Sequence, residues 1–191
     1  AAPRPIAERY ALFVGKLAKN KGVHALVEVA SKARLEMPLV VIGDGPERAS
    51  VEQAAASAGR DVRIQGWRDR REVFQWLRHA ELLMFPSVWP EPLSRVLIEA
   101  SALSVPMAAM NTGGTADIIV DEATGLLSTS VSGLAEHVAR LASDASLRAR
   151  LGSAAANRAA ANFDIPVVID RMEALYQELL AAPDRKHNAI A

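Results

Sequence analysis

The chain has 191 residues, of which 50% are hydrophobic, so it is long enough to bury the core of one domain. Its 22 basic residues balance 22 acidic ones, which excludes the broad basic surface that binds nucleic acid. Cysteine is absent, which excludes disulfides and thiol nucleophiles, and no run reaches the roughly 20 apolar residues of a transmembrane segment, so we expect a cytoplasmic protein.

Residues 1–9 are rich in proline and alanine and lack the pattern of a signal peptide, so they predict a linker ahead of a domain over 10–181. Short apolar runs predict six strands, at Tyr10–Val14, Leu39–Ile42, Val62–Ile64, Leu82–Phe85, Pro106–Ala109 and, weakly, Leu126–Leu127. Helical apolar spacing alternates with them, at Val23–Glu36, Glu47–Ala58, Arg70–His79, Ser94–Leu103 and Thr115–Val120. This alternation predicts a single α/β domain with a Rossmann-like, doubly wound parallel sheet and helices on both faces.

After Gly125 the pattern is helical only, which predicts a helical C-terminal flank. Pro166 breaks the last two helices and opens a final one, Pro166–Ala181. The final helix has an apolar face made of Val168, Met172, Leu175 and Leu179. That face predicts either association with another molecule or docking back onto the domain. Residues 182–191 are short and polar and predict a flexible tail.

Ligands of an open doubly wound sheet bind beyond the carboxyl ends of the strands, where the strand order reverses, usually beside the first and fourth strands. The loop after the first strand, Gly15–Gly22, has glycines on either side of three lysines. It has neither the Walker spacing nor the dinucleotide fingerprint. The loop is therefore either a phosphate site or a set of solvated lysines.

The loop after the fourth strand holds Glu91 between two prolines, which restrict its backbone to extended conformations. Glu99 follows eight residues later within an apolar helical run, where a charge needs a partner. Either both glutamates are ordinary solvated residues, or they accept hydrogen bonds from sugar hydroxyls while amides at the helix start face a diphosphate.

Histidine and tryptophan give weaker signals. His24, His79 and His137 fall on predicted helices and His187 in the tail, without a second ligand at metal spacing, so no metal site is predicted. Tryptophan is usually buried for its area, and Trp67 and Trp89 are the two that lie in candidate site loops.

Taken together, the motifs resemble the C-terminal, donor-binding domain of family 4 retaining glycosyltransferases of the GT-B fold. The motifs that carry the resemblance are Phe13-Val14-Gly15-Lys16-Leu17, Lys21-Gly22, Gly43-Asp44-Gly45-Pro46, Pro86-Ser87, Glu91, Glu99, Gly113-Gly114 and Thr124-Gly125-Leu126. The resemblance runs from about Tyr10 to Leu180 and keeps the family's order and spacing.

The resemblance implies a catalytic set and a donor-binding set. The catalytic set is Lys16, Lys21 and Glu91. The donor-binding set is Gly15, Trp67, Arg68, Glu91, Leu93, Ser94, Arg95 and Glu99. Lysine stands at position 16 where the family usually has arginine, and an ammonium cannot bind phosphate bidentately. Serine at position 94, where glycine is frequent, narrows the donor pocket.

The implied activity is transfer of a hexose from a nucleoside-diphosphate sugar, with UDP or GDP as the nucleotide, with retention of configuration and without a metal or other cofactor. The implied partner is an N-terminal GT-B domain that binds the acceptor, without which the chain is inactive. The parent enzyme is compatible with peripheral membrane association and with bacterial-type glycan synthesis. Two other functions stay open: a stand-alone nucleotide-binding or regulatory module, and a GT-B enzyme of another kind, such as a sugar-nucleotide epimerase or a phosphorylase.

Overall fold

The computed structural model describes residues 3–181, so the predicted tail at 182–191 and the first two residues lie outside it. Six strands form one parallel sheet, at β1 (Ala11–Val14), β2 (Leu39–Ile42), β3 (Val62–Gly66), β4 (Leu82–Phe85), β5 (Met107–Met110) and β6 (Leu126–Ser128). The order across the sheet is β3-β2-β1-β4-β5-β6. The fold class predicted from the sequence is confirmed, and the strand order reverses between β1 and β4.

Helices connect the strands and extend beyond the last one. They are the 3-10 helix η1 (Lys19–Lys21), α1 (Ala25–Lys32), α2 (Arg48–Ser57), α3 (Arg70–His79), α4 (Arg95–Ala102), α5 (Thr115–Ile118), α6 (Val131–Ser143), α7 (Ala145–Asn162) and α8 (Ile165–Ala181). The first helix is shorter than the predicted Val23–Glu36, because Arg34 adopts a left-handed backbone with φ of 50° and turns the chain. The last helix begins at Ile165, one residue before Pro166, so Pro166 opens the helix without excluding its neighbour from it.

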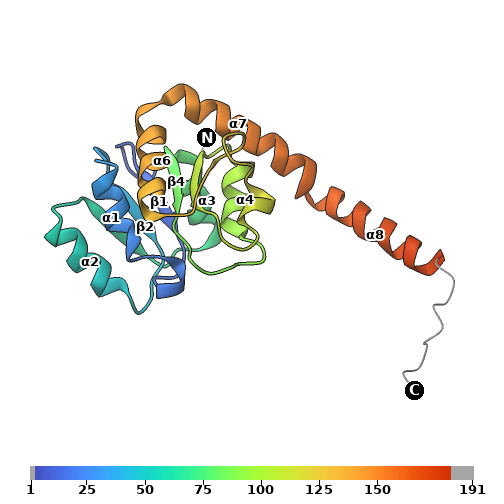
Figure 1. The fold of residues 1–191 in the computed structure, drawn as a ribbon, viewed down its shortest axis with the longest axis horizontal. Helices are drawn as coiled ribbons and strands as arrows, with labels where there is room; N and C mark the ends of the chain where they lie inside the picture. The colour runs from blue at the N-terminus through green and yellow to red at the C-terminus, as the bar shows by residue number, and fades with distance from the viewer. Residues whose placement is uncertain (1–2, 182–191) are drawn as a thin grey trace, which may run out of the picture.

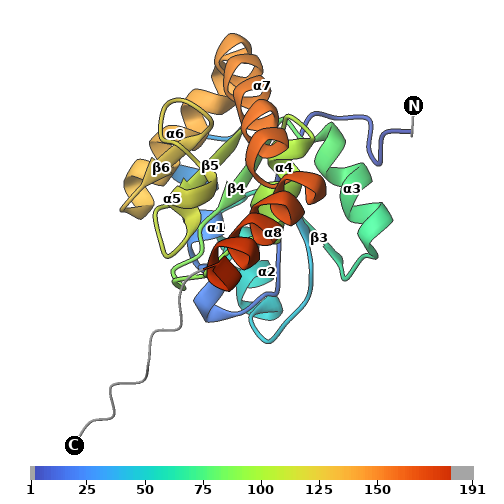
Figure 2. The ribbon, with the colours of Figure 1, turned by 90° about the vertical axis from the view of Figure 1, so that its right-hand side faces the viewer.

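Alternate residues of each central strand feed two separate cores. Phe13 faces one core together with residues of α1 and α6, whereas Leu12 faces the other with residues of α3 and α4. Figure 2 shows α3, α4 and α7 on one face of the sheet and α1 and α2 behind it. The second core includes Tyr10, whose hydroxyl donates to the backbone oxygen of Trp76 at 2.7 Å. Burial raises the pKa of Tyr10.

The final helix leaves the body of the domain. Figure 1 shows α8 running away from the sheet as the continuation of α7. No residue of α8 is buried, and its apolar face is half exposed, with Met172 at 48% and Leu175 at 52%. Docking of this helix back onto its own domain, one of the two arrangements predicted from the sequence, is therefore wrong.

Association through α8 stays a prediction. We expect the sedimentation mass of the chain to rise with concentration, because contacts between apolar helix faces remove them from water. Replacing Met172 and Leu175 with glutamate should return the chain to a monomer at all concentrations. A wild-type chain that sediments as a monomer throughout would contradict the prediction.

Candidate active site

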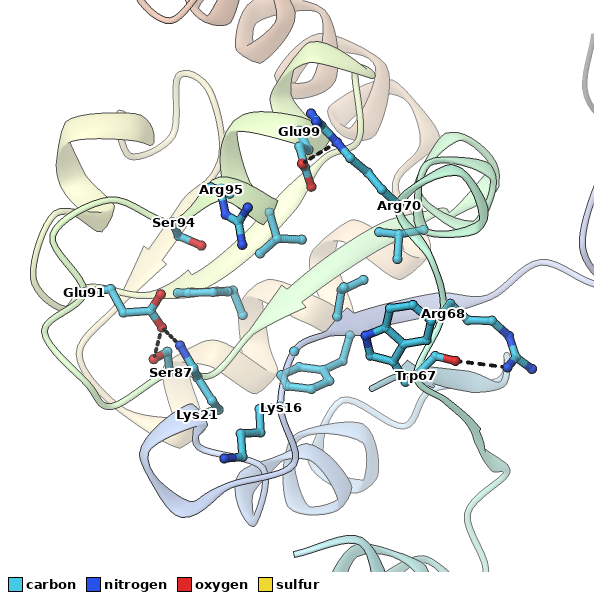
Figure 3. Close-up of a pocket in the computed structure, with 16 residues that line it drawn as sticks. Lys16, Lys21, Trp67, Arg68, Arg70, Ser87, Glu91, Ser94, Arg95 and Glu99 are labelled. Atoms are coloured by element: carbon cyan, nitrogen blue, oxygen red, sulfur yellow. Dashed lines mark hydrogen bonds and ion pairs between the residues drawn. The ribbon is translucent and has the colours of Figure 1, made fainter. Parts of the chain in front are cut away.

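A cavity of about 420 Å³ opens at the carboxyl ends of β1 and β4, where the strand order reverses. The helices that follow these two strands pack on opposite faces of the sheet, so neither covers the gap between the strand ends. Figure 3 shows the residues that line it, and Lys21 is directed towards Glu91 across the space.

The lysine loop is fixed against the loop that follows β4. Gly22 ends η1 in the left-handed region with φ of 66°, and a side chain there would place its Cβ 1.8 Å from the backbone oxygen of Pro86. The Asn20 backbone oxygen accepts hydrogen bonds from the amides of Val88 and Trp89, at 3.2 and 3.1 Å. The two loops therefore share backbone hydrogen bonds, and glycine at position 22 is required by their close approach.

A third loop supports Glu91 from the other side. The amide of Gly114 donates to the Glu91 backbone oxygen at 2.7 Å, and the Thr112 hydroxyl donates to the Ser87 backbone oxygen at 3.0 Å. A Cβ on Gly114 would lie 1.9 Å from the Pro92 backbone oxygen. The Gly113-Gly114 motif thus lets this turn lie directly against the segment that carries Glu91.

The carboxylate of Glu91 pairs with a cation inside the cavity. The Lys21 ammonium donates to Glu91 Oε1 at 2.5 Å, and the Ser87 hydroxyl donates to the same oxygen at 3.0 Å. The Lys21 and Glu91 side chains are only 28% and 16% exposed. The Lys16 side chain is exposed and makes no hydrogen bond or ion pair with any residue in 3–181. One lysine is thus held by the protein and the other is free to meet a ligand.

Glu99 is drawn into the fold, as the sequence predicts, and has a partner. Its side chain is 20% exposed, and Arg70 Nε lies 3.6 Å from its Oε1. Nearby, Ser94 precedes the first turn of α4 without making a side-chain capping bond. The amides of that first helical turn and the Glu99 carboxylate consequently face one cavity and offer both donors and an acceptor to a ligand.

Trp67 and Arg68 line the far side of the cavity from Glu91 (Figure 3). Trp67 is 74% exposed, so it does not serve the core, whereas Trp76 does. A second cavity of about 530 Å³ shares both residues and continues past Gly43 and Asp44. The two cavities together form an elongated groove with an aromatic side chain in its middle.

The structure brings together nine of the ten predicted site residues. Leu93 does not line the cavity, and its side chain is 51% exposed. Two polar lining residues are additions, Arg70 and Ser87. The sequence contains a signal for each of them. Asp69 and Glu72 have the spacing of a capping box, which places Arg70 in the first turn of α3, and Ser87 belongs to the Pro86-Ser87 motif directly after β4.

None of the histidines within residues 3–181 lines this cavity. His24 meets a carboxylate, that of Glu47 at 3.1 Å, which its sequence spacing did not reveal. His137 Nε2 lies 3.0 Å from the Leu127 backbone oxygen. Within residues 3–181 no cluster of three or more potential metal ligands is found. His187 lies outside the described residues.

The sequence of residues 3–158 matches the family described as "Glycosyl transferases group 1". The chain belongs to this family. The six-stranded parallel sheet and its helices match structural neighbours with the Rossmann-like domain of the GT-B fold. None of the helices in the described part of this group 1 chain is both long and apolar enough to cross a membrane.

Relatives of this group 1 chain are glycosyltransferases. The 2-deoxystreptamine N-acetyl-D-glucosaminyltransferase of Niallia circulans is 33% identical over 143 residues, 71% of this chain and 36% of that enzyme. Sucrose-phosphate synthase from Thermosynechococcus elongatus superposes with a TM-score of 0.79 at 28% identity, over 93% of this chain and 47% of that one. Anabaena HepE in complex with UDP-glucose superposes with a TM-score of 0.80 at 20% identity, over 90% of this chain and 49% of that one. The chain spans less than half of each of these proteins.

Proposed function

We propose that this chain is the donor-binding, C-terminal half of a family 4 retaining glycosyltransferase that takes a hexose from a nucleoside-diphosphate sugar. The observation that carries the proposal is the placing of Lys16 and Lys21 opposite Glu91 and Glu99 around one cavity at the switch point of the sheet. A cavity lined by both cations and carboxylates offers partners to a ligand in which a diphosphate lies between two sugars.

Each part of the donor has a counterpart in the cavity. Lys16, Lys21 and the amides at the start of α4 bind the diphosphate and stabilise the charge that develops when the nucleotide leaves. Glu99 accepts hydrogen bonds from the ribose hydroxyls, and Glu91 accepts them from the hexose, with the backbone of Leu93 and Ser94 beside it. The guanidinium of Arg70 lies beside the Glu99 carboxylate, at 3.6 Å.

The nucleobase occupies the groove beside Trp67 and Arg68, which continues towards Asp44. An exposed indole offers a flat face for stacking, which every base can use. We propose UDP as the first nucleotide to test, because the structural neighbour HepE is described in complex with UDP-glucose.

The remainder of the proposal concerns the whole enzyme. An N-terminal domain supplies the acceptor site, so this chain alone does not complete transfer; the chain covers only 36% of its Niallia circulans relative. Lysines and helix amides offset the negative charge of the diphosphate, so the proposed reaction requires no metal. A cytoplasmic location, consistent with a chain without cysteine, and peripheral membrane association of the parent enzyme belong to the same proposal.

The experiment that tests the proposal is a calorimetric titration of the chain with UDP, GDP and ADP in metal-free buffer, up to millimolar ligand. We expect one nucleotide to bind selectively. Replacing Lys16 and Lys21 together with alanine should weaken it by about threefold to tenfold, because both charges face the diphosphate. If no nucleotide binds the chain, and none binds after the chain is rejoined to an N-terminal domain, the donor-site proposal is wrong.

A further inference from the structure

The cavity contains an ion pair that forms without a ligand, between Lys21 and Glu91. Lys21 Nζ lies 2.5 Å from Glu91 Oε1, and Ser87, which is 1% exposed, donates to the same oxygen at 3.0 Å. Lys21 is anchored by η1 and by the close approach of Gly22 to Pro86. The pair is thus built into two loops that are held together by backbone hydrogen bonds, and it is largely shielded from water.

The other charges of the cavity are arranged differently. The Lys16 side chain is exposed and has no partner within residues 3–181, and Glu99 meets Arg70 at the longer distance of 3.6 Å, with the Arg70 side chain 79% exposed. A ligand can therefore reach Lys16 and Glu99 without breaking a close, shielded contact. To reach Lys21 it must first separate Lys21 from Glu91.

Separation has different consequences for two ligands that share the same diphosphate. When a bare nucleoside diphosphate binds Lys21, the Glu91 carboxylate keeps only the hydrogen bond from the Ser87 hydroxyl. The bare nucleotide also brings one more negative charge than the sugar nucleotide does, close to this shielded carboxylate. A sugar nucleotide also takes Lys21, but its sugar hydroxyls donate to Glu91 and replace the lost hydrogen bonds.

We propose that Lys21 and Glu91 form an exchange pair that makes this site prefer a nucleotide that carries a sugar over the same nucleotide without one. The inference rests on the proposed function, because it takes the diphosphate and the hexose to lie at these two residues. When the sugar has left, Glu91 loses its hydroxyl donors and competes again for Lys21. Return of the pair then weakens the hold on the spent nucleotide and favours its release.

The test compares the affinities of UDP and UDP-glucose, or of GDP and GDP-mannose if guanine is the base selected. The variants are Glu91→Gln, which removes the charge but keeps the shape, and Glu91→Gln combined with Lys21→Met. Glu47→Gln is the matched control, because it makes the same change at a carboxylate that pairs with His24 and does not line the cavity. Circular dichroism of each variant checks that the domain is folded.

We expect Glu91→Gln to bind the bare nucleotide about threefold to tenfold more tightly than the wild type does, because Lys21 is released to the diphosphate. The affinity for the sugar nucleotide should rise less, so the preference of the site for the sugar nucleotide over the bare nucleotide becomes smaller. Lys21→Met should abolish the gain, and Glu47→Gln should change neither affinity. If the wild type binds the bare nucleotide and folded Glu91→Gln binds it no more tightly, the exchange pair is wrong while the donor site stands. If neither ligand binds any variant, the donor site and the exchange pair fall together.

Discussion

Replacing Glu99 with alanine lowers the affinity for the selected nucleotide by about tenfold to a hundredfold, as expected when a charge-assisted hydrogen bond in a shielded site is lost. Glu99 is 20% exposed and lines the cavity from within α4, so its carboxylate is already at the site before a ligand arrives. The change also leaves the Arg70 guanidinium without this carboxylate. Calorimetry with the same nucleotide measures the effect.

Glu52→Ala is a suitable control for this substitution. Glu52 also lies inside a helix, pairs with an arginine of the same domain, Arg48 at 2.9 Å, and lies outside the cavity. Its replacement should leave nucleotide affinity unchanged. If the wild type and a folded Glu99→Ala variant bound the nucleotide equally well, Glu99 would not be part of the donor site and the proposed ribose contact would be wrong.

Replacing Gly22 with alanine destabilises the domain by more than about 2 kcal/mol, because the new Cβ forces the lysine loop away from the loop that follows β4. The clash is with backbone, 1.8 Å from the Pro86 oxygen, and backbone held by several hydrogen bonds cannot move aside locally. Urea unfolding followed by circular dichroism measures the loss. Nucleotide binding should fall as well, since both loops carry site residues.

Gly59 separates the steric effect from backbone strain. It also has a left-handed backbone, with φ of 58°, but a Cβ there would meet nothing within 4 Å. Gly59→Ala should therefore cost only the strain of a left-handed alanine, about 1 kcal/mol. If Gly22→Ala and Gly59→Ala lowered the free energy of unfolding by similar amounts, the close approach of Gly22 to Pro86 would not be a steric constraint.

The sheet could be predicted from the sequence because its strands are buried on both faces and appear as short, uninterrupted apolar runs. Leu39–Ile42 and Leu82–Phe85 match the structure residue for residue. The edge strand β3 was predicted too short, because it continues beyond Ile64 to Gly66. Gln65 and Gly66 are not apolar, so a search for apolar runs ends the strand before them. The early end of α1 at Lys32 depends on the backbone angle of Arg34, which no apolar pattern encodes.

The location of the site followed from topology, but its internal contacts did not. A reversal of strand order between β1 and β4 places the loops after these strands together, which was enough to group Lys16, Lys21 and Glu91. The pairing of Lys21 with Glu91 joins residues 70 positions apart, and the contact of Arg70 with Glu99 joins the start of α3 to the middle of α4. Such contacts depend on the packing of whole elements, so sequence spacing cannot reveal them.

The three loops around the cavity are joined by main-chain atoms: Asn20 to Val88 and Trp89, and Glu91 to Gly114. These bonds do not depend on the identity of the side chains that point into the cavity. The loop framework can thus stay constant while the lining residues are exchanged, and the domain is suited to directed evolution of its ligand preference. Libraries that vary positions 16, 67 and 94 but retain the glycines at 22 and 114 would alter recognition without dismantling the scaffold.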